Sequence, residues 1–136
     1  MCIRDRLYTN LITAAVTLSR PRLEGLQKLG LDHVQISFQD VDEENAERIS
    51  AYPQGLKKKL EVAGWVTELG LPLTINAPIH RHNIHSVPRY IELALKLGAQ
   101  RLEVAHAQYY GWAYLNRAAL IPTCLLYTSP SPRDRS

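Results

Sequence analysis

Cysteine is nearly absent from this sequence: among 136 residues it occurs only as Cys2 and Cys124. The long middle stretch therefore offers no disulfide, no thiolate nucleophile and no cysteine ligand for a metal. Long apolar runs are missing as well, since none approaches the roughly 18 residues that a membrane-spanning helix needs. No signal peptide opens the chain. These absences favour a soluble, cytoplasmic protein without a membrane partner.

The two ends differ from the middle in composition. The chain begins MCIRDR and closes CLLYTSPSPRDRS, and both ends carry the tripeptide RDR. These strings resemble translated sequencing-adapter read-through, so we expect 1–6 and 124–136 to be adapter-derived; a natural flexible tail is the alternative. Without the ends, 12 basic and 11 acidic residues remain in 7–123. A balance so close to neutral gives no reason to expect a nucleic-acid partner.

A repeated junction organises the middle of the chain. Leu-Gly, one apolar residue and two linking residues precede a short strand-like run in LGLDHVQIS, LGLPLTINA and LGAQRLEVA. The glycines are Gly30, Gly70 and Gly98, and a glycine just past a helix end adopts the left-handed conformation without steric cost. Apolar residues at helical spacing precede each junction. Each repeat therefore predicts a helix that ends at the glycine and is followed by a strand.

The predicted order alternates strands with helices, which indicates an α/β fold with parallel strands and right-handed crossovers, about four βα units in all. A barrel or a doubly wound sheet would satisfy this order. No glycine-rich phosphate fingerprint follows any strand, which argues against a dinucleotide-binding fold. Ser19, Asp42 and Ser86 are the expected helix caps. The expected strands are 7–12, 33–38, 72–79 and 101–106, and the expected helices are 21–30, 43–47, 56–69 and 87–97.

Alternate residues of a strand face opposite sides of a sheet. Val34, Ile36 and, on the last strand, Val104 lie on sides that we expect to pack against helices. The other sides carry polar residues, which predicts one shared interior that is polar and partly open, as if to hold a ligand; buried polar groups that bond one another are the alternative. Strand carboxyl ends are the usual sites of α/β folds. The interior residues are Asn10, placed near the carboxyl end of its strand, Gln35, Ser37, Asn76 and Glu103.

Four stretches resemble one family. LYTNLIT, GLDHVQISFQD, LPLTINAPIHRHN and RLEVAHAQYYGWAYLNRAALIPT are similar to the middle of coenzyme PQQ synthesis protein E, the PqqA peptide cyclase family of radical S-adenosylmethionine (SAM) enzymes. The resemblance covers 7–123, and HVQISFQD and VAHAQYYGWA are its specific parts. It implies the radical SAM core, a partial (β/α)6 TIM barrel, of which this chain would supply strands three to six.

The resemblance also implies an activity in pyrroloquinoline quinone biosynthesis. A [4Fe-4S] cluster would cleave SAM reductively, and a Glu and a Tyr of the precursor peptide PqqA, presented by the small chaperone PqqD, would be joined by a carbon–carbon bond. The family's C-x3-C-x2-C cluster motif, its GGE segment and its domain for auxiliary clusters are absent from this sequence. We therefore expect 7–123 to be a fragment of the barrel domain of a longer parent, inactive alone.

Family roles carry over to a few positions as implications of the resemblance. Ser37 in ISFQD matches a serine that contacts the nucleoside ribose, and Arg48 in ENAERIS matches an arginine that binds the methionyl carboxylate. A guanidinium fork suits that carboxylate; pairing of Arg48 with Glu44 on a solvated helix face is the alternative. Asn76 is a further candidate for cofactor binding.

Three histidines within PIHRHNIHSVP raise the question of a metal site. His80, His82 and His85 have H-x-H-x2-H spacing, which could in principle ligate zinc. No carboxylate or thiolate lies near them in sequence, and the similar family has no zinc role here, so we expect no metal ligands. Residues that line the substrate mouth are expected instead: His80, Arg81, His106, Tyr109 and Tyr110.

Other functions remain open at this stage. A different radical SAM enzyme that modifies peptides would share the same cofactors. A cofactor-free α/β-barrel isomerase or aldolase would need its own acid and base, for which Glu103 and His106 are the obvious pair. A binding module with a polar cleft would need no chemistry at all.

Overall fold

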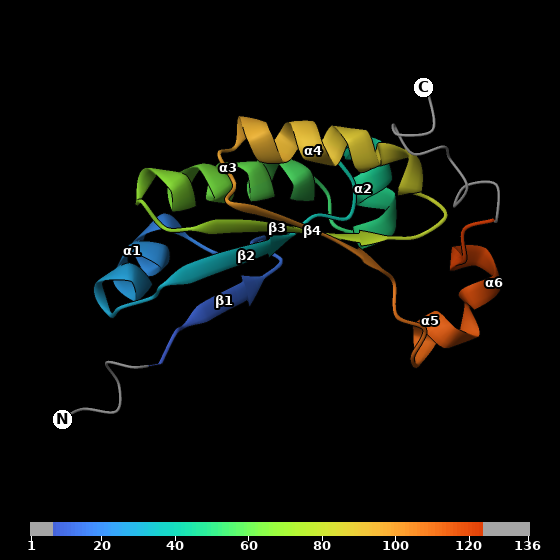
Figure 1. The fold of residues 1–136 in the computed structure, drawn as a ribbon, viewed down its shortest axis with the longest axis horizontal. Coiled ribbons are helices and arrows are strands. Elements are labelled where there is room, and N and C mark those ends of the chain that lie inside the picture. The colour runs from blue at the N-terminus through green and yellow to red at the C-terminus, as the bar shows by residue number, and fades with distance from the viewer. Residues whose placement is uncertain (1–6, 124–136) are drawn as a thin grey trace, which may run out of the picture.

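Four parallel strands form one sheet in the computed structural model, which describes residues 7–123 (Figure 1). The predictions made for 1–6 and 124–136 lie outside the described residues. Spatial order follows chain order, β1-β2-β3-β4, as in a barrel wall, whereas a doubly wound sheet reverses its strand order at a switch point. The α/β prediction is confirmed in its barrel-like form. The strands are β1 (Asn10–Thr13), β2 (His33–Ser37), β3 (Leu73–Ile79) and β4 (Arg101–His106).

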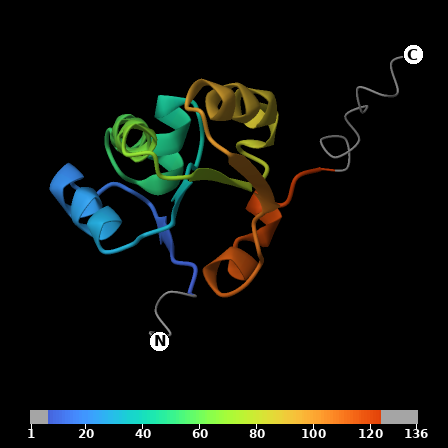
Figure 2. The ribbon, with the colours of Figure 1, turned by 60° about the vertical axis from the view of Figure 1, so that its left-hand side comes forward.

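The long helices lie along the outer side of the curved sheet (Figure 2). They are α1 (Arg20–Lys28), α2 (Glu43–Ser50), α3 (Gly55–Glu68) and α4 (Val87–Lys96), and the short 3-10 turn η2 (Ile84–Ser86) leads into the last of them. Two further helices, α5 (Trp112–Leu115) and α6 (Arg117–Leu120), follow β4 and were not predicted, because four residues are too few to show a helical apolar period. No helix within 7–123 is long and apolar enough to cross a bilayer.

The first strand is shorter than predicted, since β1 begins at Asn10 rather than at Leu7. Just before it, the backbone N–H and the hydroxyl of Thr9 each donate to a carboxylate oxygen of Asp32 at 2.8 Å. This side-chain pairing replaces the strand ladder there. Asn10 therefore lies at the amino end of β1, and our placement of it near the carboxyl end was wrong.

Glycine ends three helices as the repeated junction predicts. Gly30, Gly70 and Gly98 have φ angles of +93°, +70° and +63°. At the end of α3, the N–H of Gly70 bonds to the carbonyl of Thr67 and the N–H of Leu71 to that of Val66, both at 3.0 Å. The other two junctions repeat this pair of bonds. This Schellman arrangement satisfies carbonyls that a helix end would otherwise leave unpaired.

The predicted caps have different outcomes. Asp42 caps α2, since its carboxylate accepts the N–H of Asn45 at 3.0 Å. Ser19 and Ser86 occupy the cap positions of α1 and α4, but neither side chain makes a capping bond. Ser86 cannot act as expected because it belongs to η2 and already has helical backbone angles. Its hydroxyl is the one buried side-chain polar atom within 7–123 that has no hydrogen-bond partner.

The core lies between the sheet and its helices, as the alternation predicts. Val34 and Ile36 of β2 and Phe38, the residue that follows it, are fully buried. Val104 is an exception, because 50% of it is exposed. It lies on β4, the edge strand of the described sheet, where no further helix of 7–123 covers this side.

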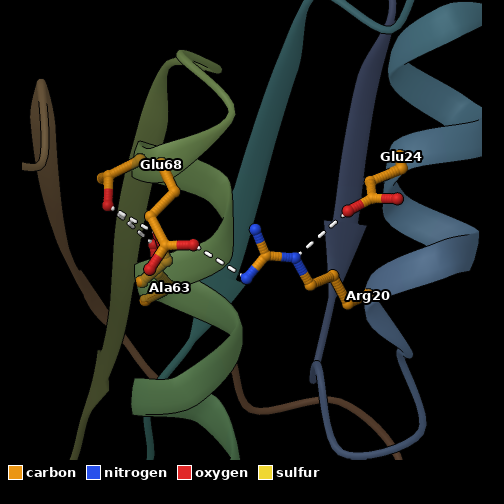
Figure 3. A network of polar contacts seen from close by, with 6 residues as sticks. Arg20, Glu24, Ala63 and Glu68 are labelled. Carbon is orange, nitrogen blue, oxygen red and sulfur yellow. Dashed lines mark hydrogen bonds and ion pairs between the residues drawn. The ribbon is translucent and has the colours of Figure 1, made fainter.

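Polar contacts on the surface join α1 to α3 (Figure 3). The guanidinium of Arg20 contacts Glu24 in its own helix at 3.1 Å and Glu68 of α3 at 2.9 Å. Exposed ion pairs of this kind contribute little stability. Gln27 adds a partly buried hydrogen bond, in which its side-chain amide donates to the carbonyl of Leu69 at 2.6 Å.

Candidate functional site

The inner face of the sheet carries a row of polar side chains. In the strand register Ser37 lies beside Asn76, and Asn76 lies beside Glu103. The Asn76 amide donates to the Ser37 hydroxyl at 3.3 Å, and the Gln35 amide donates to the Glu103 carboxylate at 3.2 Å. All four side chains are only partly buried. The predicted shared polar and partly exposed side is therefore confirmed for these four residues. Their hydrogen bonds to one another are those of the alternative interpretation, and the binding of a ligand here stays a prediction.

A second polar row lies one layer toward the amino ends of the strands. The ring of His33 connects the hydroxyl of Tyr8, at 3.0 Å, with that of Thr74, at 2.8 Å. Asn10 is the register partner of His33 and so faces the same side, although it is exposed. This row lies at the end of the sheet opposite to the one where α/β folds place their sites, which removes Asn10 from the candidate site.

Two buried polar residues join the carboxyl ends of β2 and β3. The carboxylate of Asp40 accepts the N–H groups of Val41 at 2.6 Å and Asp42 at 3.2 Å, and also the side-chain amide of Asn45. Asn83 donates to the carbonyls of residues 39 and 78 and accepts the N–H of residue 80. Since both side chains are fully buried and fully bonded, they fix the loops from which the candidate residues project.

Asn45 holds the two loops together from the first turn of α2. Its amide nitrogen donates to Asp40 and, at 2.9 Å, to the carbonyl of His82. Its oxygen accepts a hydrogen bond from the Arg48 guanidinium at 2.6 Å. Within the described part of the chain Arg48 forms no ion pair with Glu44, the partner of the alternative interpretation, although both line one small hollow. Asn45 was missed by the sequence analysis because its partners are remote in sequence.

Two predicted site residues share a cavity of about 360 Å³ at the carboxyl ends of β2 and β3. Arg48 comes from α2 and His80 from the end of β3, and neither lies near the other in sequence. Ile49, His82 and Leu120 complete the lining. One cofactor-binding candidate and one substrate-lining candidate thus meet here, whereas the other two cofactor-binding candidates, Ser37 and Asn76, do not line this cavity.

The imidazole of His80 is nearly buried. Burial is the main cause that lowers its pKa, and His82 adds to the effect, while the carboxylate of Asp40 opposes it. The two rings meet edge to face with centroids 5.6 Å apart. Nowhere in 7–123 do three His, Cys, Asp or Glu side chains come together as metal ligands would.

Arg81 is used to hold another segment. Its backbone N–H donates to the carbonyl of Leu120 at 2.8 Å, and its guanidinium Nε donates to that of Ile121 at 2.8 Å. These bonds attach the end of α6 to the loop after β3. The segment that follows β4 therefore returns to the carboxyl ends of the neighbouring strands, and Leu120 becomes a wall of the cavity.

The remaining candidates lie in β4 or beyond its end. Tyr109 and Tyr110 line a separate hollow of about 590 Å³, mainly with Trp112 and Tyr114. His106 is the register partner of buried Ile79, so it faces the helix side, whereas Glu103 faces the polar side. The acid–base pair required by the isomerase alternative is therefore not assembled.

Lys59 is a further polar residue at this end of the sheet. It is buried in α3, and its ammonium group donates to the carbonyl of Ser37 at 2.7 Å and to the side chain of Gln39. Burial lowers its pKa to about 8. The sequence analysis singled out none of the three lysines of LKKKL, although only Lys59 stands at helical spacing from Val62, Ala63 and Val66, the apolar residues that α3 buries.

No family model matches the chain. Curated proteins named PqqA peptide cyclase do match: that of Methylorubrum extorquens (strain PA1) is 58% identical over 121 residues, and that of Rhodopseudomonas palustris is 61% identical over 117. These alignments cover 89% and 86% of this chain, but 32% and 31% of the relatives. The chain thus spans about a third of the length of the curated relatives that it matches.

Solved structures share the fold at low sequence identity. Streptococcus suis SuiB bound to precursor peptide SuiA has a TM-score of 0.66 at 15% identity, over 90% of this chain and 34% of that one. Escherichia coli coproporphyrinogen III oxidase (HemN), a radical SAM enzyme, has a TM-score of 0.65 at 15% identity, over 93% of this chain and 29% of its own. The fold is that of the radical SAM partial barrel, and by sequence the chain is a homologue of the PqqA peptide cyclases that corresponds to about a third of their length.

Proposed function

We propose that 7–123 forms the central part of the catalytic barrel of a radical SAM enzyme of pyrroloquinoline quinone biosynthesis, which crosslinks a Glu and a Tyr of the peptide PqqA through a carbon–carbon bond. The observation that carries this proposal is the identity of 58% to a PqqA peptide cyclase along 89% of the chain. The polar inner face of the sheet supports it, because a closed TIM barrel fills its interior with branched apolar side chains, whereas this face carries groups that can bond to a ligand.

Residues of this face and of helix α2 suit different parts of SAM. Ser37 and Asn76 offer a hydroxyl and an amide to a ribose, and Arg48 offers a guanidinium to the methionyl carboxylate. When bound at a [4Fe-4S] cluster, SAM supplies radical chemistry. The chain itself does not suit the cluster, because no cysteine lies in 7–123 and such clusters are held by cysteine thiolates. No step through the cluster follows from these residues.

A peptide is the proposed substrate, with the small chaperone PqqD as a further partner. The fold neighbour SuiB was solved with its precursor peptide SuiA, which supports a peptide partner for this fold. The substrate-lining roles of His80, Arg81, His106, Tyr109 and Tyr110 belong to the proposal, as does a cytoplasmic location.

The test places 7–123 into the M. extorquens relative in exchange for the corresponding segment. The anaerobically reconstituted chimaera should bind SAM and crosslink PqqA, with loss of two hydrogens seen by mass spectrometry. Crosslinking of another precursor, and not of PqqA, would favour a different peptide-modifying radical SAM enzyme. A chimaera that binds SAM and modifies neither peptide would contradict the proposal.

Variants of the chimaera test the assigned cofactor contacts. Ser37→Ala removes a neutral hydrogen bond of about 0.5–1.5 kcal/mol, whereas Arg48→Ala removes a charge-assisted contact of roughly 1.5–3 kcal/mol. The dissociation constant for SAM should therefore rise by about tenfold or more for Arg48→Ala and by less for Ser37→Ala. Arg22→Ala, a change at an exposed arginine of α1, is the control. Unchanged affinity in the Arg48 variant would return this residue to the solvated-face interpretation.

A further inference from the structure

The cavity beside Arg48 has donors on two of its walls. The guanidinium of Arg48 uses one NH2 group to donate to Asn45 at 2.6 Å. Within the described residues no acidic side chain pairs with Arg48, and none lines this cavity. A guanidinium has five N–H donors, so several remain for a ligand. Asn45 also donates to the carbonyl of His82. This bond links the side of the cavity that carries Arg48 to the side that carries the histidines.

His80 supplies the second donor, and its tautomer follows from geometry. The backbone N–H of His82 donates to Nδ1 of His80 at 3.2 Å. A nitrogen that accepts a hydrogen bond carries no proton, so the proton of this ring lies on Nε2. The lowered pKa of His80 agrees with a neutral ring. Within 7–123, Nε2 has no hydrogen-bond partner of its own.

We propose that this cavity is a carboxylate-binding pocket in which the Arg48 guanidinium and the Nε2–H group of His80 donate to the same ligand. A carboxylate has two oxygens and about four acceptor positions, so it can accept from both walls at once. Leu120 and Ile49 form the apolar part of the lining, and partial exclusion of water there strengthens charge-assisted bonds. The new element is His80 as a ligand-binding residue together with Arg48.

Two sources could supply the carboxylate: the amino-acid part of a cofactor or an acidic side chain of a peptide. The choice between them rests on the proposed function, whereas the pocket itself does not. The neighbouring acids do not fill it. Asp40 is buried and already accepts three hydrogen bonds. Asp42, which caps α2, and Glu44 line a separate hollow that Arg48 also borders, but among the described residues neither forms an ion pair with it.

The first experiment uses the full chain labelled with ¹⁵N only at its five histidines. A long-range ¹H–¹⁵N spectrum at neutral pH should show His80 with a bare Nδ1 and a protonated Nε2. Acetate should then shift the His80 signals in a saturable way, whereas neutral acetamide should not. A proton on Nδ1, or equal responses to acetate and acetamide, would overturn the pocket even without any variant.

Variants then assign the donors. Arg48→Gln should weaken acetate binding about tenfold and His80→Gln about fivefold, because each removes one donor to the carboxylate. His85→Gln is the matched control, since His85 is exposed and outside the cavity. Acetate binding to the Arg48 variant is measured from the shifts of the His80 signals. Acetate binding to the His80 variant is measured from the signals of a ¹⁵N-labelled Arg48. Binding that survives the loss of either side chain in a folded variant, judged by circular dichroism, would refute the shared site.

A last pair of probes distinguishes the sources. S-adenosylhomocysteine that binds more tightly than acetate and depends on both donors indicates a cofactor carboxylate. Glutarate that binds more tightly than acetate and depends on both donors indicates an acidic side chain of a peptide. Either result supports the pocket, and binding of neither compound contradicts it. A chimaera without crosslinking activity beside an intact acetate site would contradict the proposed function alone.

Discussion

At the scale of the residue, burial separates one lysine from its neighbours. Lys57 is exposed on α3, whereas Lys59 is only 4% exposed two positions later. Its ammonium group is held by the Ser37 carbonyl and the Gln39 side chain, with the ring of Phe38 at 5.9 Å. No carboxylate among the described residues pairs with it. A charge buried with only neutral partners is costly, which is why its pKa falls to about 8.

The stability of the chain should therefore depend on pH through Lys59. The folded state releases this proton near pH 8, while the unfolded state keeps it up to about 10.5. Between these values the unfolded state binds more protons, so the unfolding free energy of the wild type rises with pH. The advantage of Lys59→Met over the wild type should thus shrink by roughly 1 kcal/mol per pH unit across that window. Urea unfolding at a series of pH values measures this.

Lys57→Met is the matched control for the loss of a lysine charge from α3. The difference in unfolding free energy between Lys57→Met and the wild type should not shrink as the pH rises, as it should for Lys59→Met. Parallel curves for the two variants would show that Lys59 is charged alike in the folded and unfolded states.

At the scale of the element, two glycines of one α3 segment should respond in opposite ways. Gly70 ends the helix with φ +70°, and a side chain there is strained although nothing lies within 4 Å. Gly70→Ala should cost about 1–2 kcal/mol. Gly64 lies within the helix, also with nothing within 4 Å of an added Cβ, so Gly64→Ala should stabilise by about 0.5–1 kcal/mol. Thermal or urea unfolding of both variants, measured at low protein concentration, provides the comparison.

The same pair of variants supplies its own control, because the chemical change is identical at both positions. Equal effects on unfolding would mean that the left-handed helix end is not formed in solution. The repeated Leu-Gly junction would then have no structural role at this position.

At the scale of the molecule, the described sheet has two edges, β1 and β4. Unpaired strand edges associate with other chains. Ile12 is 65% exposed on β1, which adds apolar surface next to that edge. We expect the isolated chain to self-associate as its concentration rises, and Ile12→Lys to reduce this, since charge on an edge strand opposes pairing. Sedimentation velocity over a wide concentration range measures it.

Thr17→Lys adds the same charge at an exposed loop position away from the strand and should leave association nearly unchanged. A monomer at every concentration that unfolds in one sharp transition would contradict the expectation that open edges govern the behaviour of the isolated chain.

The chain by itself should also be inactive. It has two cysteines in all, fewer than the three of the C-x3-C-x2-C motif. Anaerobic reconstitution with iron and sulfide should yield neither a stoichiometric charge-transfer band nor cleavage of SAM. Either signal from the unmodified chain would disprove this prediction.

Local features of the sequence were sufficient for most of the fold. Periodic apolar residues before a glycine located α1, α3 and α4, a cap followed by acidic residues located α2, and alternation located the buried sides of β2 and β3. The errors have local causes too: Thr9 pairs with Asp32 instead of extending β1, and Ser86 belongs to a 3-10 turn. Helices α5 and α6 were too short to detect.

The sequence by itself determined the order of elements, the strand faces and the polar inner row, because these depend on backbone sterics and on the periods of helix and strand. Only the tertiary structure decided which polar groups meet. Asn45 reaches the carbonyl of His82 across 37 positions, and Arg48 shares a cavity with His80, because parallel strands bring their carboxyl ends to one edge of the sheet. The helical period places Lys59 on the buried stripe of α3 with Val62 and Val66, but only the packing of α3 on β2 decided that its ammonium group meets the Ser37 carbonyl and the Gln39 side chain.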